Sequence, residues 1–206
     1  MKITLLGIDG SGKSTLAKMT TEHLRQKGFD VTIVPFHKWI FADFFRDRLG
    51  IGKIIDRDRK PRKTSYHAPK KKSLSAFIKP PIALVDNILF YLLNQPRRRN
   101  EIYIYDRFIC ATQIKLAALN YHTKWLKFIW WNISGDWTFV IDIDPAVSLK
   151  RQTERNDPYT YPTEILQTER RWYLDIAKSK GYTVIDNSQR IDDAFNRIIN
   201  ILNPQK

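Results

Sequence analysis

The sequence predicts an α/β fold in which helices cover both faces of a parallel sheet. Short apolar segments alternate with amphipathic segments along the whole chain, a pattern typical of such sheets. Residues 137–143 form a continuous apolar run of the kind that is buried on both faces. The 206 residues are enough for one domain with a sizeable core, and we expect a single domain over 1–206 because no internal repeat is visible.

We expect five strands, at residues 2–6, 29–34, 101–105, 137–143 and 182–185, and helices at residues 13–27, 39–49, 82–93, 110–120, 125–132, 145–155, 163–180 and 191–202. Gly28 and Gly181 are placed to stop two of these helices, and Asp144-Pro145 is placed to cap the start of another. The helix at 82–93 is expected to follow Pro80-Pro81. Residues 50–79 lack clean periodicity and predict a long, basic, mobile loop, with a helical piece within it left open.

The formal net charge of +14 is concentrated in one segment. Residues 46–79 hold twelve Lys or Arg against three Asp, so this segment carries most of the excess. Binding to a polyanion such as nucleic acid, arginines gathered around nucleotide phosphates, and a basic surface that keeps the protein soluble are three open explanations. The local excess favours a basic loop over a basic fold.

The single cysteine, Cys110, excludes an intrachain disulfide and fits a reducing cytoplasm. No secretory signal is visible at the start of the sequence, and no apolar run approaches the roughly 20 residues that span a bilayer. We therefore expect a cytoplasmic protein without a membrane span.

Residues 7–14, Gly-Ile-Asp-Gly-Ser-Gly-Lys-Ser, form a P-loop between the first strand and the first helix. In this motif backbone N–H groups turn toward a phosphate chain, and the N-terminus of the helix adds a favourable dipole. Lys13 is expected to reach the β- and γ-phosphates of a bound nucleotide, and the Ser14 hydroxyl to ligate Mg²⁺. The residues predicted to bind the nucleotide phosphates, which the resemblance described below implies are those of ATP, are Gly7, Gly10, Ser11, Gly12, Lys13, Ser14 and Thr15.

Asp106 and Arg107 follow the third strand. Ligands of open parallel sheets gather at the carboxyl ends of strands, so this pair is expected near the P-loop. The Asp106 carboxylate could hold Mg²⁺ or accept a proton from the attacking group, and the Arg107 guanidinium could grip an acceptor phosphate. A surface ion pair at a strand end is the other interpretation.

Arg151 and Arg155 lie four residues apart on one predicted helix face, and a segment with two prolines follows at 156–162. This pattern favours a movable lid over 150–162 whose arginines stabilise the transferred phosphoryl group. An arginine in that role can lower a barrier by about 4–7 kcal/mol. A solvated basic face is the alternative.

Taken together, these motifs resemble thymidylate kinase. The resemblance rests on the P-loop with Asp9, on Asp106-Arg107-Phe108, on 142–145 before an arginine-bearing helix, and on Tyr173 in the long helix. It implies a P-loop kinase three-layer fold with a five-stranded parallel sheet and a lid. It also implies transfer of the γ-phosphate of ATP to dTMP, giving dTDP for nucleotide biosynthesis, with Mg²⁺.

The resemblance further assigns roles to individual residues. Lys13, Asp106, Arg151 and Arg155 become the predicted catalytic residues, with Ser14 and Asp106 at the metal. Asp9 would face the sugar hydroxyl of the acceptor and Arg107 its phosphate. Asn187, in the loop at 186–188, would lie beside the adenine of ATP.

The phosphate-handling motifs match this family better than the base-reading ones. The chain reads Val-Pro-Phe-His-Lys-Trp at 34–39, where the family usually has Arg-Glu-Pro-Gly after the second strand. The helix before the third strand offers Phe90 as an acceptor-binding aromatic but no arginine until 97–99. A kinase of another nucleotide or sugar, and a nucleic-acid-binding P-loop ATPase, therefore stay as alternatives, and a homodimer stays open.

Overall fold

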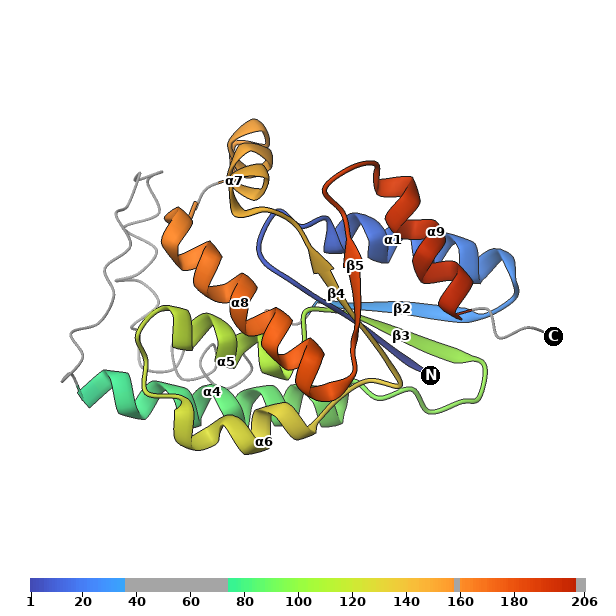
Figure 1. Ribbon diagram of the computed structural model, residues 1–206. Coiled ribbons are helices and arrows are strands. Elements are labelled where there is room, and N and C mark those ends of the chain that lie inside the picture. Colours follow the sequence, from blue (N-terminus) through green and yellow to red (C-terminus); the bar gives the residue numbers. More distant parts are fainter. Residues whose placement is uncertain (36–73, 158–159, 203–206) are drawn as a thin grey trace.

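Five parallel strands form the centre of the molecule, in the order β2-β3-β1-β4-β5 (Figure 1). The computed structural model describes residues 1–35, 74–157 and 160–202. The strands are β1 (Lys2–Leu6), β2 (Asp30–Pro35), β3 (Glu101–Asp106), β4 (Trp137–Asp142) and β5 (Thr183–Asp186). This sheet confirms the predicted fold class.

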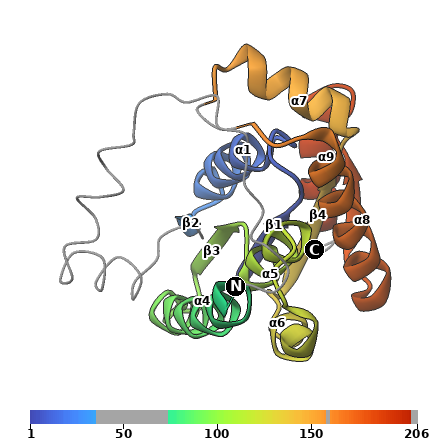
Figure 2. The ribbon, with the colours of Figure 1, turned by 90° about the vertical axis from the view of Figure 1, so that its left-hand side faces the viewer.

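Helices cover both faces of the sheet (Figures 1 and 2). On one face lie α1 (Lys13–Gln26) and α9 (Ile191–Leu202). On the other lie α4 (Leu74–Leu93), α5 (Ile109–Ala118) and α8 (Thr163–Lys180), with a 3-10 turn (Lys124–Leu126) and α6 (Lys127–Asn132) outside them. The helix α7 (Pro145–Glu154) lies beyond the carboxyl end of β4.

Alternating side chains of the strands build two separate cores. Ile3 and Leu5 of β1 pack with α1 and α9, whereas Leu6 packs with α4, α5 and α8. In β4, Phe139 and Ile141 join the first core and Val140 joins the second. The period of two is the expected consequence of strand geometry, and it makes β1, β3 and β4 apolar on both faces.

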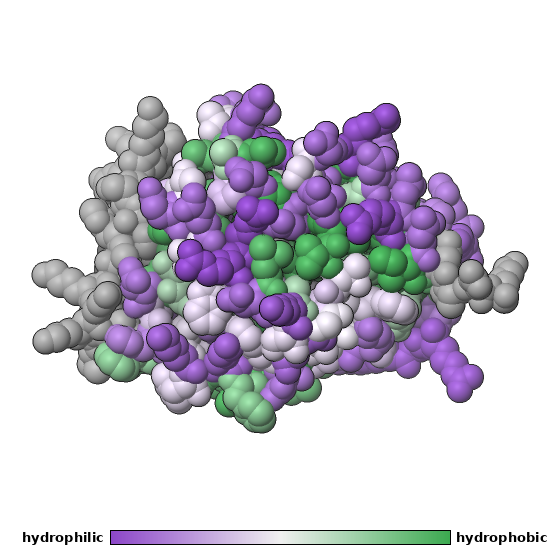
Figure 3. All heavy atoms as spheres, in the orientation of Figure 1, coloured by the Kyte–Doolittle hydropathy of each residue, from purple (hydrophilic) through white to green (hydrophobic). Residues whose placement is uncertain are grey.

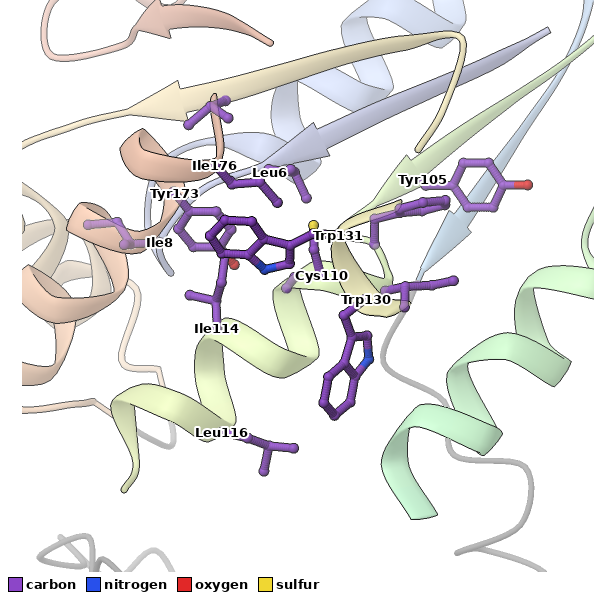
Figure 4. Packing of buried hydrophobic residues seen from close by; sticks show 14 of the residues in the cluster. Leu6, Ile8, Tyr105, Cys110, Ile114, Leu116, Trp130, Trp131, Tyr173 and Ile176 are labelled. Carbon is purple, nitrogen blue, oxygen red and sulfur yellow. The ribbon is translucent and has the colours of Figure 1, made fainter. Parts of the chain in front are cut away.

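The core between the sheet and α5, α6 and α8 is rich in large side chains (Figure 4). Trp130, Trp131 and Tyr173 are buried there, close to Cys110. Burial raises the pKa of the Cys110 thiol to about 12, so the thiol is protonated at neutral pH.

Local signals at helix ends are confirmed. The Asp144 side chain caps α7 by accepting the Ala146 N–H at 2.8 Å, and Pro145 occupies the first helical turn. Gly181 ends α8 with a left-handed φ of 69°. The α7 helix is thereby fixed directly at the carboxyl end of β4, next to the P-loop.

The start of α4 differs from the sequence prediction. The helix begins at Leu74, so 74–79 form a helical piece within the segment 50–79. Pro80 and Pro81, expected to precede the helix, lie inside it. A proline within a helix costs roughly 3 kcal/mol because it lacks an N–H and crowds the preceding turn. Pro80, Ala83 and Leu84 are all buried, so tertiary packing overrides this local preference. The rest of that loop and the helix expected at 39–49 lie outside the described residues.

The described surface is mainly hydrophilic on the face shown in Figure 3, with hydrophobic atoms gathered in its middle and at its lower edge. The exposed apolar side chains include Trp125 and Phe128, at 63% and 79% exposure, beside and in α6. Within the described residues no helix combines the length and the apolar character needed to cross a membrane.

We predict that Ile104→Ala lowers the free energy of unfolding by about 2–5 kcal/mol, because Ile104 is fully buried in a central strand. The matched control is Val184→Ala in the edge strand β5, where the side chain is 37% exposed. The control should cost less than about 1.5 kcal/mol in the same chemical denaturation experiment. Equal losses would show that the sheet centre does not carry the stability.

Candidate functional site

The P-loop follows β1 and ends at the first turn of α1. Gly10 and Gly12 have left-handed φ angles of 79° and 91°. A Cβ atom at Gly10 would lie 2.9 Å from the Ser148 carbonyl oxygen, and one at Gly12 would lie 2.4 Å from Asn187 Nδ2. Glycine is therefore required at both positions by backbone conformation and by close packing.

A cavity of about 230 Å³ lies at the carboxyl ends of the strands, between the P-loop, the end of β3 and α7. Its charged lining consists of three cations and three carboxylates, and its other lining residues come from the P-loop and α7. The lining residues are Asp9, Gly10, Gly12, Lys13, Ser14, Thr15, Asp106, Arg107, Gln152, Arg155 and Asp157. The structure thus brings most of the predicted site residues to one place.

Lys13 is folded back onto the loop that carries it. Its ammonium donates to the Ile8 carbonyl at 2.7 Å and to the Ser11 hydroxyl at 3.3 Å, and the residue is 5% exposed. Burial lowers the pKa of Lys13 to about 8, although the negative charge of Asp106 opposes the shift. A phosphate chain in the cavity would give this ammonium the anionic partner that it lacks within the loop.

Asp106, at the end of β3, accepts a hydrogen bond from the Ser14 hydroxyl. One hydroxyl and one carboxylate at the cavity wall suit Mg²⁺, which commonly takes one or two protein ligands and completes its shell with water and phosphate oxygens. No cluster of three or more His, Cys, Asp or Glu able to hold a metal by itself occurs among the described residues. The pair therefore fits a metal that arrives with a nucleotide, as predicted for Ser14 and Asp106.

Asp9 and Arg107 form an ion pair across the cavity. The Arg107 backbone has a φ of 77°, which is unusual for a residue with a side chain, and its N–H is bonded to the Leu5 carbonyl at 3.0 Å. This conformation directs the chain away from β3 at the edge where ligands bind. The Arg107 side chain is 29% exposed, so its guanidinium is accessible from the cavity.

The two predicted lid arginines reach different places. Arg155 lines the cavity and pairs with Asp157 at 2.7 Å, with 54% of its side chain exposed. Arg151 instead donates to the Asn187 carbonyl at 3.0 Å and does not line the cavity. Sharing a helix face therefore does not bring the two residues to one site.

Asn187 stabilises the P-loop through hydrogen bonds. Its buried side-chain amide donates to the Ser11 carbonyl at 2.8 Å, and its backbone N–H donates to the Asp142 carbonyl at 2.9 Å. These contacts are structural, so any contact with the adenine would come in addition to them. Phe90, predicted to bind the acceptor, is 8% exposed, belongs to the core beside α5 and does not line the cavity.

Sequence reasoning missed four polar residues that surround Asp9. From α7, Gln152 Nε2 donates to the Asp9 carbonyl at 3.3 Å, and the Ser148 hydroxyl donates to the same oxygen. From α5, Lys115 Nζ lies 3.0 Å from Asp9 Oδ2 and 2.6 Å from Glu169 Oε1 of α8. The sequence carries a signal for the last pair, because Lys115 is the sole charged residue of α5 and Glu169 interrupts the buried face of α8.

Comparison with known proteins extends the likeness over nearly the whole chain. No protein-family model matches. A probable thymidylate kinase of Sulfurisphaera tokodaii is 25% identical over 203 residues, covering 97% of this chain and 94% of that protein. A thymidylate kinase of Ligilactobacillus salivarius is 27% identical, covering 98% and 96%. These relatives confirm the resemblance drawn from the motifs.

Solved structures show the same fold. A deoxyadenosine kinase from M. mycoides with bound dCTP aligns with a TM-score of 0.62 and 17% identity, over 98% of both chains. A thymidylate kinase from Ehrlichia chaffeensis aligns with a TM-score of 0.60 and 20% identity, again over 98% of both chains. The chain therefore shares its three-layer fold with these two solved kinases.

We predict that Gly12→Ala abolishes measurable ATP binding in calorimetry, because the new Cβ would displace Asn187 and distort the loop. The matched control is Gly28→Ala, where φ is 87° but no atom lies within 4 Å of the added Cβ. The control carries the backbone strain of about 1–2 kcal/mol without the clash, and it should bind ATP normally. Loss of binding in both variants would contradict the role given to Asn187.

Lys13→Met should stabilise the nucleotide-free protein by about 1–2 kcal/mol at pH 7, since removing a desolvated charge outweighs the loss of two hydrogen bonds. The unfolded chain holds the lysine proton to higher pH than the folded one does. The free energy of unfolding of the wild type should therefore rise between pH 8 and about 10.5. Over the same pH range, the difference in free energy of unfolding between Lys13→Met and the wild type should disappear. Denaturation at several pH values measures both stabilities, and a pH-independent difference would refute the burial penalty.

Proposed function

We propose that this thymidylate kinase-like chain transfers the γ-phosphate of ATP to the phosphate of a nucleoside monophosphate, with dTMP as the preferred acceptor and dTDP as the product. The likeness to thymidylate kinases spans nearly the full chain and supports this class of phosphotransferase. The site would act on soluble nucleotides, and we expect it to do so in the cytoplasm.

One observation carries the proposal: the P-loop and the Asp9–Arg107 pair line the same cavity. The loop is suited to hold the donor triphosphate, and Arg107 supplies a fork of N–H donors for a second phosphate. A simple ATPase needs the first element alone. Two elements suited to bind phosphate at one cavity favour transfer between two phosphorylated substrates.

The residues suggest a sequence of events based on exchange of partners. On arrival of ATP, the Lys13 ammonium would leave the Ile8 carbonyl and bind phosphate oxygens. Arg107 would turn from Asp9 to the acceptor phosphate, and Arg155 from Asp157 to the transferred group. Each cation thus begins with a partner inside the protein, and phosphate oxygens of the bound substrates would replace that partner.

Ser14 and Asp106 are the residues that would hold Mg²⁺, which neutralises charge on the phosphate chain when it is bound. Positioning supplies the rest of the catalysis, because the reacting oxygens must meet in line. We further propose that 150–162, of which 158 and 159 lie outside the described residues, is a lid whose closure over the cavity excludes water and so limits hydrolysis of ATP.

The test is phosphate transfer from labelled ATP to a panel of nucleoside monophosphates, with dTMP first and thymidine and deoxyadenosine as hydroxyl acceptors. The wild type should form dTDP in a magnesium-dependent reaction. Lys13→Met should lower kcat at least about 10²-fold, because it removes one donor to the phosphate chain. Its retained fold is verified by the denaturation experiment above.

Different outcomes separate the alternatives. Turnover of another nucleotide with dTMP inert would keep the kinase and change its acceptor. ATP hydrolysis stimulated by DNA or RNA, without transfer to any small acceptor, would replace the proposal with a nucleic-acid-dependent ATPase. Full activity of Lys13→Met would remove the assignment of the P-loop.

A further inference from the structure

Asp9 is held by two cations that differ in their surroundings. Arg107 contacts Oδ1 from the cavity wall, with 29% of its side chain exposed. Lys115 contacts Oδ2 at 3.0 Å and is not part of the cavity lining. One partner of Asp9 is therefore accessible to a ligand, and the other lies behind the carboxylate.

The Lys115 ammonium is fixed in its place by two further groups. Glu169 Oε1 lies 2.6 Å away, and the Glu169 side chain is 1% exposed. The ring of Tyr161 covers the ammonium, with its centroid 3.8 Å from Nζ, a distance typical of a cation–π contact. Moving Lys115 away would leave the deeply buried Glu169 carboxylate without a cation, which is costly, so we expect Lys115 to keep its position. Arg107, in contrast, pairs only at the accessible edge of Asp9.

We infer that Lys115 is a positioning residue that keeps Asp9 paired and so allows Arg107 to leave Asp9 for the acceptor phosphate; this inference rests on the proposed function. When Arg107 turns to the phosphate, Asp9 loses one cation. With Lys115 present, a compact charge remains at Oδ2, and the carboxylate is not left alone in a partly buried site. Without Lys115, Arg107 would be the one side-chain cation that the described residues place on Asp9, and its release would be harder.

A purely structural role for Lys115 makes a different prediction. In that case Lys115 serves to neutralise the buried Glu169, and Lys115→Met would destabilise the fold without a selective effect on the acceptor. The variant Glu169→Gln removes the need for neutralisation while keeping the shape of the side chain. Lys115→Met is therefore compared within the Glu169→Gln background, where the protein carries no unpaired buried carboxylate.

In steady-state kinetics, Lys115→Met/Glu169→Gln should raise the KM for dTMP about tenfold over Glu169→Gln alone, as expected for the loss of one charged hydrogen-bond partner. The KM for ATP and kcat should change by less than about twofold, since Lys13 and Arg155 are untouched. Lys115→Arg in the same background should restore most of the affinity, because it returns a cation to Asp9.

A third arm uses Asp9→Asn, which removes the charge that restrains Arg107. The comparison is between Asp9→Asn/Lys115→Met/Glu169→Gln and Asp9→Asn/Glu169→Gln. Their KM values for dTMP should agree within about twofold, because Arg107 is no longer held by a charge at residue 9. Two outcomes would overturn the inference even if the wild type transfers phosphate. One is that Lys115→Met does not change the KM for dTMP when Asp9 is intact, and the other is that Lys115→Met raises this KM equally when Asp9 is replaced. Wild-type protein that turns over no monophosphate would overturn the proposed function and, with it, this inference.

Discussion

The site depends on the tight packing of the P-loop against two distant parts of the chain. Gly10 lies against the Ser148 carbonyl of α7, and Gly12 lies against the side chain of Asn187 after β5. These contacts leave no room for a Cβ and hold the backbone in left-handed conformations. The sheet makes them reachable, because β1, β4 and β5 are adjacent and parallel and so deliver these segments to one edge.

The electrostatics of the cavity follow from that arrangement. Lys13, Arg107 and Arg155 each contact a carbonyl or a carboxylate of the protein. The site is thus nearly neutral inside, although the chain as a whole is strongly basic. Under the proposed function, affinity for phosphate would come from an exchange of partners, in which a doubly charged ligand competes with single carboxylates or with a neutral carbonyl.

The sequence was sufficient for several features that have a local signature. The five strands, the P-loop and the cap at Asp144 follow from residue order and spacing alone, and so does the placement of Asp106 and Arg107 at the cavity. The start of α4 could not be found this way, because burial of Pro80 against the core outweighs the local effect of proline. Phe90 has the right residue type for a binding aromatic, but packing places it in the core.

The residues around Asp9 show why the remainder of the site was out of reach. Lys115, Gln152 and Glu169 lie 106, 143 and 160 positions along the chain from it, on three different helices. Whether a lone lysine in an apolar helix meets a carboxylate depends on how α5 and α8 pack over the sheet. Spacing rules within one element carry no information about such a meeting. Arg151 shows the opposite difficulty. Its spacing from Arg155 predicted the helix face correctly, but on that face Arg151 contacts the Asn187 carbonyl and not the cavity.

The buried position of Cys110 has a practical consequence. It is the sole cysteine of the chain, and its thiol is enclosed and protonated at neutral pH. Thiol-reactive dyes and spin labels should therefore not react with the native protein under mild conditions. A cysteine introduced on the exposed surface of α7, with a second on α9, would accept such probes selectively, so distances between them could be followed during turnover without first removing a native thiol.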